Sequence, residues 1–207
     1  MFDTEYGIAS LVLKEIPYKG IAYIIFREVW DAEKLLAECV SFCRMCGAEV
    51  ICASGHESLE RYPLYTAVLE MRGEAVVDKV SLKSLFPVTE ATVSQWRSIY
   101  NEKMRPIDNA ATMTAFDEKR ILESGGAYFV HENGDLLGIG WMDDTELLAV
   151  AAAKPGLGRP VMNTLMSLIE GAQMKLEVAS TNERAIRLYE KMGFIPVKEI
   201  GRWYKIS

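Results

Sequence analysis

The sequence predicts an α/β fold with a mixed β-sheet flanked by helices, and three features support this prediction. An Asn133-Gly134 dipeptide between two apolar runs marks a β-hairpin. An apolar run at Glu146–Ala152 leads through a glycine-containing loop into an apolar helix and then another strand, which is the pattern of a β-α-β crossover. Because hairpins pair antiparallel strands and crossovers pair parallel ones, the sheet must contain both strand directions.

The N-terminal part of the chain shows its own series of elements. The patterns predict a hairpin of strands 8–13 and 21–29, a helix over residues 32–46, a strand at 49–53, a short helix near Ser54, and strands at 64–71 and 75–80. Gly47 follows the first helix at a position typical of a C-cap. A second series of elements begins near Leu85, which indicates a domain boundary there. We therefore expect an accessory α/β domain at residues 1–84 and a second domain at residues 85–207.

The second domain is predicted to begin with two helices, over residues 91–104 and 116–122, which Pro106 and Gly125-Gly126 end. The elements expected next are strands at 128–131, 135–142 and 146–152, a helix at 157–169, a strand at 174–179, a helix at 182–192, and strands at 194–200 and 202–206. This order again combines hairpins with crossovers, as a mixed sheet requires.

Composition excludes several classes of function. The chain has 207 residues, half of them hydrophobic, and a net charge of −6. An acidic chain without a basic cluster is not expected to bind nucleic acid. No apolar run approaches the ~20 residues that span a bilayer, and the first residues lack the pattern of a signal peptide, so we expect a cytoplasmic protein without a membrane segment.

Three cysteines, Cys39, Cys43 and Cys46, have the spacing C-x3-C-x2-C, which also holds iron–sulfur clusters in some enzymes. They lie at helical spacing within residues 32–46, together with Leu35 and Leu36. This periodicity favours the buried face of a helix over a metal site. With only two histidines in the chain, His-based metal sites are not expected either, so we predict no metal.

The loop after the 146–152 strand is the first candidate for chemistry. Gly156-Leu157-Gly158 precedes a helix, and Lys154 and Arg159 place positive charge beside it. A helix N-terminus offers unpaired backbone N–H groups, and glycines let a phosphate approach them closely. On this pattern alone, a tight turn without a ligand remains an equal alternative.

The helix that follows residues 174–179 is the second candidate. Asn182 is placed to cap it. Asn182 and Tyr189 are seven residues apart and therefore lie on about the same helix face, with the small residue Ala185 between them. A ligand could lie along this face. The alternative is a capped amphipathic helix whose Tyr and Phe residues pack in the core.

Together, these two features resemble the GNAT superfamily of N-acetyltransferases. Its members show Q/R-x-x-G-x-G/A before one helix and N-x-x-A-x-x-x-Y-x-x-x-G-F in a later one. The second pattern is complete here, as Asn182, Ala185, Tyr189, Gly193 and Phe194. The first departs from the family, because Ala153 occupies the Q/R position and the loop is about two residues short. The resemblance covers residues 85–207 and implies a GNAT-like acyl-CoA N-acyltransferase fold.

The resemblance also implies a binding site for acetyl-CoA as cosubstrate. The pyrophosphate would lie on the amides of Gly156, Leu157, Gly158 and Arg159. The pantetheine arm would lie between diverging strands, where an N–H group among Val150, Ala151 and Ala152 would polarise the thioester carbonyl. Asn182 would bind the arm and Tyr189 would protonate the departing thiolate.

The expected reaction is direct attack of a primary amine, either a small molecule or a peptide amino group, on the acetyl carbonyl. Glu146 is the first candidate for the base that removes the amine proton, with Asp143, Asp144 and His131 as alternatives. The competing interpretation is a catalytically silent acyl-CoA-binding or regulatory module. Either a monomer or a homodimer is compatible with the sequence.

Residues 47–61 and 171–187 share an order of features: a helix end, Gly-Ala, a strand, Ala-Ser and a helix. This similarity suggests that residues 1–84 are a degenerate GNAT-like half that has lost its cofactor site. Chance similarity is the alternative.

Overall fold

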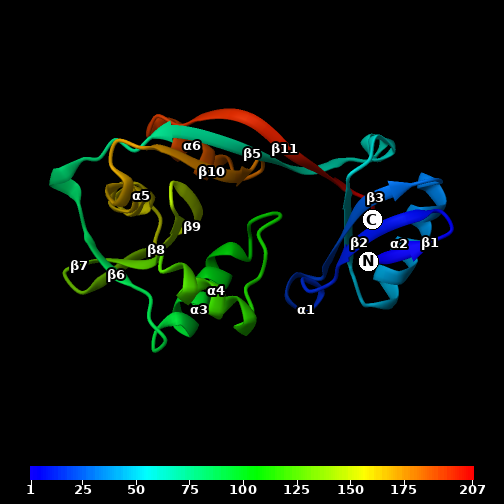
Figure 1. Ribbon diagram of the computed structural model, residues 1–207, viewed down its shortest axis with the longest axis horizontal. Helices are drawn as coiled ribbons and strands as arrows, with labels where there is room; N and C mark the ends of the chain where they lie inside the picture. The colour runs from blue at the N-terminus through cyan, green and yellow to red at the C-terminus, as the bar shows by residue number, and fades with distance from the viewer. The chain divides into compact units, whose positions relative to one another are not determined.

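The computed structural model describes residues 1–207, and the chain forms two compact units (Figure 1). The first unit comprises Met1–Val68 with Glu199–Ser207, and the second comprises Leu69–Lys198. Strands β5 (Leu64–Glu74) and β11 (Ile195–Lys205) contribute residues to both units. The boundary expected between residues 84 and 85 lies within the second unit.

The first unit is a sheet with one main covering helix. Its elements are β1 (Phe2–Thr4), β2 (Gly7–Val12), α1 (Ile16–Lys19), β3 (Ile21–Val29), α2 (Ala32–Met45), β4 (Val50–Ser54) and a 3-10 helix (Glu57–Arg61). The strand order is β1-β2-β3-β4-β11. Strands β2 and β3 are antiparallel, which confirms the first predicted hairpin, whereas β3 and β4 are parallel and joined through α2.

The cysteines of α2 and its C-cap differ in burial. Cys39 and Cys43 are fully buried in the core of the first unit, as the helical periodicity predicts. Cys46 is exposed, so its predicted place on the buried face is wrong. The physical reason is that α2 ends at Met45, and Cys46 is the C-cap residue, where the helical spacing no longer applies.

The second unit is a mixed sheet flanked by helices. Its strand order is β5-β10-β9-β8-β7-β6. The elements that follow β5 are a 3-10 helix (Lys79–Ser81), β6 (Ser84–Pro87), α3 (Val93–Met104), α4 (Ala115–Ser124), β7 (Ala127–Glu132), β8 (Asp135–Asp143), β9 (Glu146–Ala152), α5 (Gly158–Met166), a 3-10 helix (Ser167–Ile169), β10 (Gln173–Ala179), α6 (Glu183–Lys191) and β11. The predicted mixed α/β class is confirmed.

The predicted strands differ from the structure at three places. Residues 64–71 and their continuation form one strand, and residues 75–80 form no strand, because this segment crosses α5 instead. There the side chain of Asn163 binds the N–H and C=O groups of Asp78, at 2.8 and 2.9 Å. The two C-terminal strands are a single strand that runs through Gly201. Strand β6 was not predicted. It is an edge strand, the position in a sheet that tolerates Pro87.

Helix α5 lies unusually close to the sheet. Six consecutive residues, Val161–Met166, are buried. Glycines on β8 permit this approach, because a Cβ atom at Gly138 would lie 2.8 Å from the side chain of Val161, and one at Gly140 would lie 2.3 Å from that of Leu165. Close packing fixes the N-terminus of α5 at the end of β9. None of the helices combines the length and the hydrophobicity that a membrane span needs.

The parallel strands β9 and β10 pair over only two residues each, at the start of β9 and near the start of β10. The register contains Lys175 opposite Glu146 and Leu176 opposite Leu147, and no pairs beyond them. β9 remains paired with β8 as far as Ala152. The edge of β9 that faces β10 is therefore unpaired along its second half, and the candidate site lies there.

Candidate functional site

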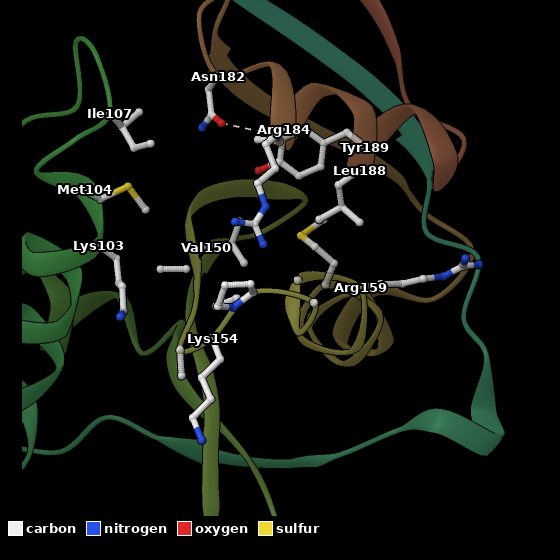
Figure 2. Close-up of a pocket in the computed structure, with 18 of the residues that line it drawn as sticks. Lys103, Met104, Ile107, Val150, Lys154, Arg159, Asn182, Arg184, Leu188 and Tyr189 are labelled. Carbon is white, nitrogen blue, oxygen red and sulfur yellow. Dashed lines mark hydrogen bonds between the residues drawn. The ribbon is translucent and has the colours of Figure 1, made fainter.

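A cavity of about 510 Å³ lies in the second unit (Figure 2). It is bounded by the end of α3, the end of β9, α6 and the loop that contains Gly156-Leu157-Gly158, called the glycine loop below. Residues far apart in the sequence line it together. It collects all but one of the residues predicted to bind the donor: Val150, Ala151, Ala152, Lys154, Gly156, Gly158, Arg159, Asn182 and Ala185. Tyr189 lines it as well. The exception is Leu157, whose side chain packs against the core and whose N–H group donates to the carbonyl oxygen of Lys154, at 3.3 Å.

The end of β9 offers two backbone donors to this cavity. The N–H group of Ala153 donates to the carbonyl oxygen of Leu137, at 2.8 Å, and so points toward β8. Because successive N–H groups alternate between the two edges of a strand, those of Val150 and Ala152 point to the other edge. No strand pairs with that edge here. Unpaired N–H groups require a partner from water or a ligand.

The glycine loop and the first turn of α5 add further donors. No side chain caps this helix, so the N–H groups of Gly158 and Arg159 have no partner within the helix. Gly156 has φ +91°, a left-handed conformation that favours glycine. The loop therefore presents backbone N–H groups and the positive end of a helix dipole, which together favour an anion.

Helix α6 forms the opposite wall. The side-chain oxygen of Asn182 accepts a hydrogen bond from the N–H group of Ala185, at 3.2 Å, so Asn182 caps the helix as predicted. Its amide nitrogen takes no part in the cap and lies on the cavity side in Figure 2. The hydroxyl group of Tyr189 points from α6 toward the cavity. Burial raises the pKa of Tyr189 to about 12, so the phenol stays protonated at neutral pH.

The charge of the cavity is opposite to that of the whole protein. Its lining contains Lys103, Lys154, Arg159 and Arg184 but no Asp or Glu, although the chain carries a net charge of −6. Lys103 is 3.0 Å from Glu102. The other three cations form no ion pair. Clustered unpaired cations beside free backbone N–H groups make a site for a polyanionic ligand.

The candidate bases lie outside this cavity. Glu146 begins β9, where β9 and β10 still pair, and its carboxylate is 3.1 Å from the ammonium group of Lys175. Asp143 ends β8 and Asp144 occupies the following turn, with φ +51°. His131 lies on β7 beside Phe86 and Phe129. None of the four lines the cavity.

Sequence reasoning missed two parts of the cavity wall. Lys103, Met104, Pro106 and Ile107, from the end of α3 and the loop after it, carry no motif that distinguishes them from an ordinary helix end. Arg184 was also missed, although a basic residue in the first turn of a helix is unfavourable to the helix dipole and could have served as a signal.

Comparisons with known proteins agree with this geometry. Residues 93–194 match the model of the Acetyltransferase (GNAT) family. No curated protein matches the chain by sequence. Among solved structures, a functionally unknown conserved protein from Staphylococcus epidermidis ATCC 12228 is 13% identical, with a TM-score of 0.56 over 99% of this chain and 91% of that one.

Two named acetyltransferases share the fold. A GCN5-related N-acetyltransferase from Anabaena variabilis ATCC 29413 is 10% identical, with a TM-score of 0.61 over 89% of this chain and 55% of that one. A GCN5-related N-acetyltransferase from Sphaerobacter thermophilus is 11% identical, with a TM-score of 0.53 over 95% and 74%. At these identities the likeness establishes the fold alone.

The second unit is an α/β fold with a cavity, lined by cations, beside the unpaired end of β9. Residues 93–194 form a domain of the acetyltransferase (GNAT) family.

Proposed function

We propose that the protein is an N-acetyltransferase that transfers the acetyl group of acetyl-CoA to a primary amine. The observation that carries this proposal is the cavity of the second unit, where unpaired cations, a helix N-terminus and free N–H groups of β9 meet. Membership of the GNAT family supports acyl transfer as the reaction class. The acceptor is a small amine or a peptide amino group.

In the proposed binding mode, the glycine loop and Lys154 receive the phosphate groups of the donor. The acyl-bearing arm lies along the free edge of β9. There, the N–H group of Val150 or Ala152 donates to the thioester carbonyl oxygen and stabilises the negative charge that develops on it during amine attack. Asn182 donates its amide N–H to the arm, because its oxygen is engaged in capping α6.

The role of Tyr189 follows from its raised pKa. A thiol has a pKa of about 8.5, so complete proton transfer from a phenol with a pKa of about 12 to the thiolate is unfavourable by about 3.5 pKa units. A hydrogen bond from the protonated phenol to the departing sulfur carries no such cost. We therefore propose that Tyr189 stabilises the thiolate as a hydrogen-bond donor. Glu146 remains the candidate base and would act through water, because it lies outside the cavity.

A silent acyl-CoA-binding module is the second candidate, and one observation favours it: no carboxylate lines the cavity. Calorimetric titration with acetyl-CoA, followed by a thiol-release assay with a panel of primary amines, separates the two functions. Binding with turnover supports the enzyme, and a Tyr189→Phe variant should then turn over about tenfold to a hundredfold more slowly. Binding without turnover on any amine supports the silent module, and no binding rejects both.

We also propose that the first unit is a degenerate GNAT-like half without a donor site. Its series β2-β3-α2-β4 repeats the order and strand directions of β8-β9-α5-β10. However, β3 and β4 pair over five residues, so these strands do not diverge. The carboxylate of Asp31 also caps α2 by accepting from the N–H group of Lys34, which blocks an anion there. One donor per chain is therefore expected.

A further inference from the structure

Arg184 is a cation of the cavity that no sequence motif assigns. It is the second residue of α6. Figure 2 shows its guanidinium group extending from the helix into the cavity, in the direction of Val150 and Lys154. It forms no ion pair or hydrogen bond within the protein. A guanidinium group with no internal partner is free to bind an anionic group of a ligand in bidentate fashion.

The position of Arg184 is unfavourable for the helix itself. A cation in the first turn lies at the positive end of the helix dipole. Its neighbour Arg187 shows how the same helix uses an arginine for stability, since Arg187 is 2.9 Å from Glu183 in an i,i+4 ion pair. Arg184 has no such pair. A residue that breaks a local rule without a structural gain marks a place where function determines the side chain.

Arg159, the arginine that the glycine-loop pattern indicates, is directed elsewhere. In Figure 2 its side chain runs away from the centre of the cavity. It also lines a neighbouring cavity of about 530 Å³, together with Asp78, Asn163 and Lys191. The backbone N–H group of Arg159 still belongs to the first turn of α5, but its guanidinium group is not aimed at the space above the loop.

We propose that Arg184, rather than Arg159, supplies the guanidinium group that holds the phosphate groups of the acyl donor. Arg184 reaches these groups from α6, while the backbone N–H groups of the glycine loop bind them from the side of α5. The proposal rests on the proposed function, because it takes a CoA thioester as the donor. It assigns Arg184 to binding the donor and gives it no part in the chemistry of acyl transfer.

The test compares Arg184→Gln, Arg159→Gln and Arg187→Gln by calorimetric titration with CoA at low and high salt. Arg184→Gln should weaken CoA binding about tenfold to a hundredfold at low salt, as expected for loss of charge-assisted hydrogen bonds, and the difference should shrink at high salt. Arg184→Lys should recover part of the loss. Arg187→Gln should stay within about twofold of the wild type, and Arg159→Gln should weaken binding by much less than Arg184→Gln does.

Thermal unfolding of the ligand-free variants separates binding from a structural role. Removing a cation from the first turn of α6 should leave the melting temperature of Arg184→Gln unchanged or raise it slightly. Weaker CoA binding without lower stability supports the proposal. Arg184→Gln with wild-type affinity, or Arg159→Gln with an equal loss, overturns it while leaving the proposed function intact. Wild-type protein that fails to bind CoA overturns both.

Discussion

Asn182 combines two tasks that substitution can separate. Its side-chain oxygen caps α6, and its amide nitrogen is proposed to donate to the acyl donor. Asn182→Ala removes both groups. Asn182→Asp keeps an oxygen for the cap and replaces the donor with a second acceptor that carries negative charge. Asp31→Ala is the matched control, because Asp31 caps α2 in the first unit through an equivalent hydrogen bond of 3.1 Å to Lys34.

The expected magnitudes follow from these contacts. Loss of an N-cap costs about 1 kcal/mol, so Asn182→Ala and Asp31→Ala should both lower the free energy of unfolding by about that amount. Asn182→Asp should retain or slightly gain stability, since a carboxylate suits the positive end of the helix dipole. The donated hydrogen bond is worth about 1 kcal/mol, so Asn182→Ala should weaken acetyl-CoA binding about fivefold. Asn182→Asp should weaken it at least as much, and Asp31→Ala should not change it.

Urea unfolding gives the stabilities and calorimetric titration with acetyl-CoA gives the affinities. The decisive variant is Asn182→Asp, for which stability and affinity should move apart. If this variant binds acetyl-CoA as tightly as the wild type, the amide nitrogen has no contact with the donor and the proposed binding mode is wrong. If it is strongly destabilised, the assignment of the side-chain oxygen to the cap is wrong.

Three further predictions concern the ionisable groups. Burial raises the pKa of Tyr189 to about 12 in the folded state, whereas the unfolded chain loses this proton near pH 10. Between pH 8 and pH 11, the free energy of unfolding of the wild type should therefore fall by about 1.4 kcal/mol more than that of Tyr189→Phe. Equal losses in urea unfolding would contradict burial of the hydroxyl group. Burial also raises the pKa of Cys39 to about 12 and that of Cys43 to about 11, and Cys52 is buried as well. A colorimetric thiol reagent should therefore label only Cys46 rapidly in the native protein. A second fast-reacting thiol would refute this packing. Glu146→Gln should lower kcat/KM for the amine without changing the acetyl-CoA affinity, and unchanged turnover would exclude Glu146 as the base.

Local patterns were sufficient for most elements of the second unit. The Asn133-Gly134 turn, the limits of β9 and the cap at Asn182 all depend on residues close in sequence, which fix turn type, strand length and helix start. The segment at residues 75–80 was assigned wrongly because its conformation depends on Asn163, more than 80 residues away. The burial of Cys46 was predicted wrongly for a different reason: α2 ends one residue before it, and hydrophobic periodicity does not locate the last residue of a helix.

The candidate site also contains residues that local patterns predict and residues that they do not. Motif residues on β9, the glycine loop and α6 are brought together by the β-α-β crossover, so sequence order already implied that they are neighbours. Met104 and Ile107 reach the cavity through the packing of α3 on the sheet, which no local pattern encodes. The direction of Arg159 could not be predicted either, because the segment that crosses α5 forms the second cavity into which this side chain is turned.

We propose that the cavity of the second unit binds an acyl-CoA donor and that the first unit does not. Calorimetric titration of the full chain with acetyl-CoA, repeated with Gly158→Asp, tests it most directly. The added carboxylate would stand in the first turn of α5, where its Cβ atom meets only the end of the Leu188 side chain, at 2.9 Å, and it would repel the phosphates. We expect one binding site per chain, lost in Gly158→Asp. Two sites, or binding unaffected by this substitution, would contradict it.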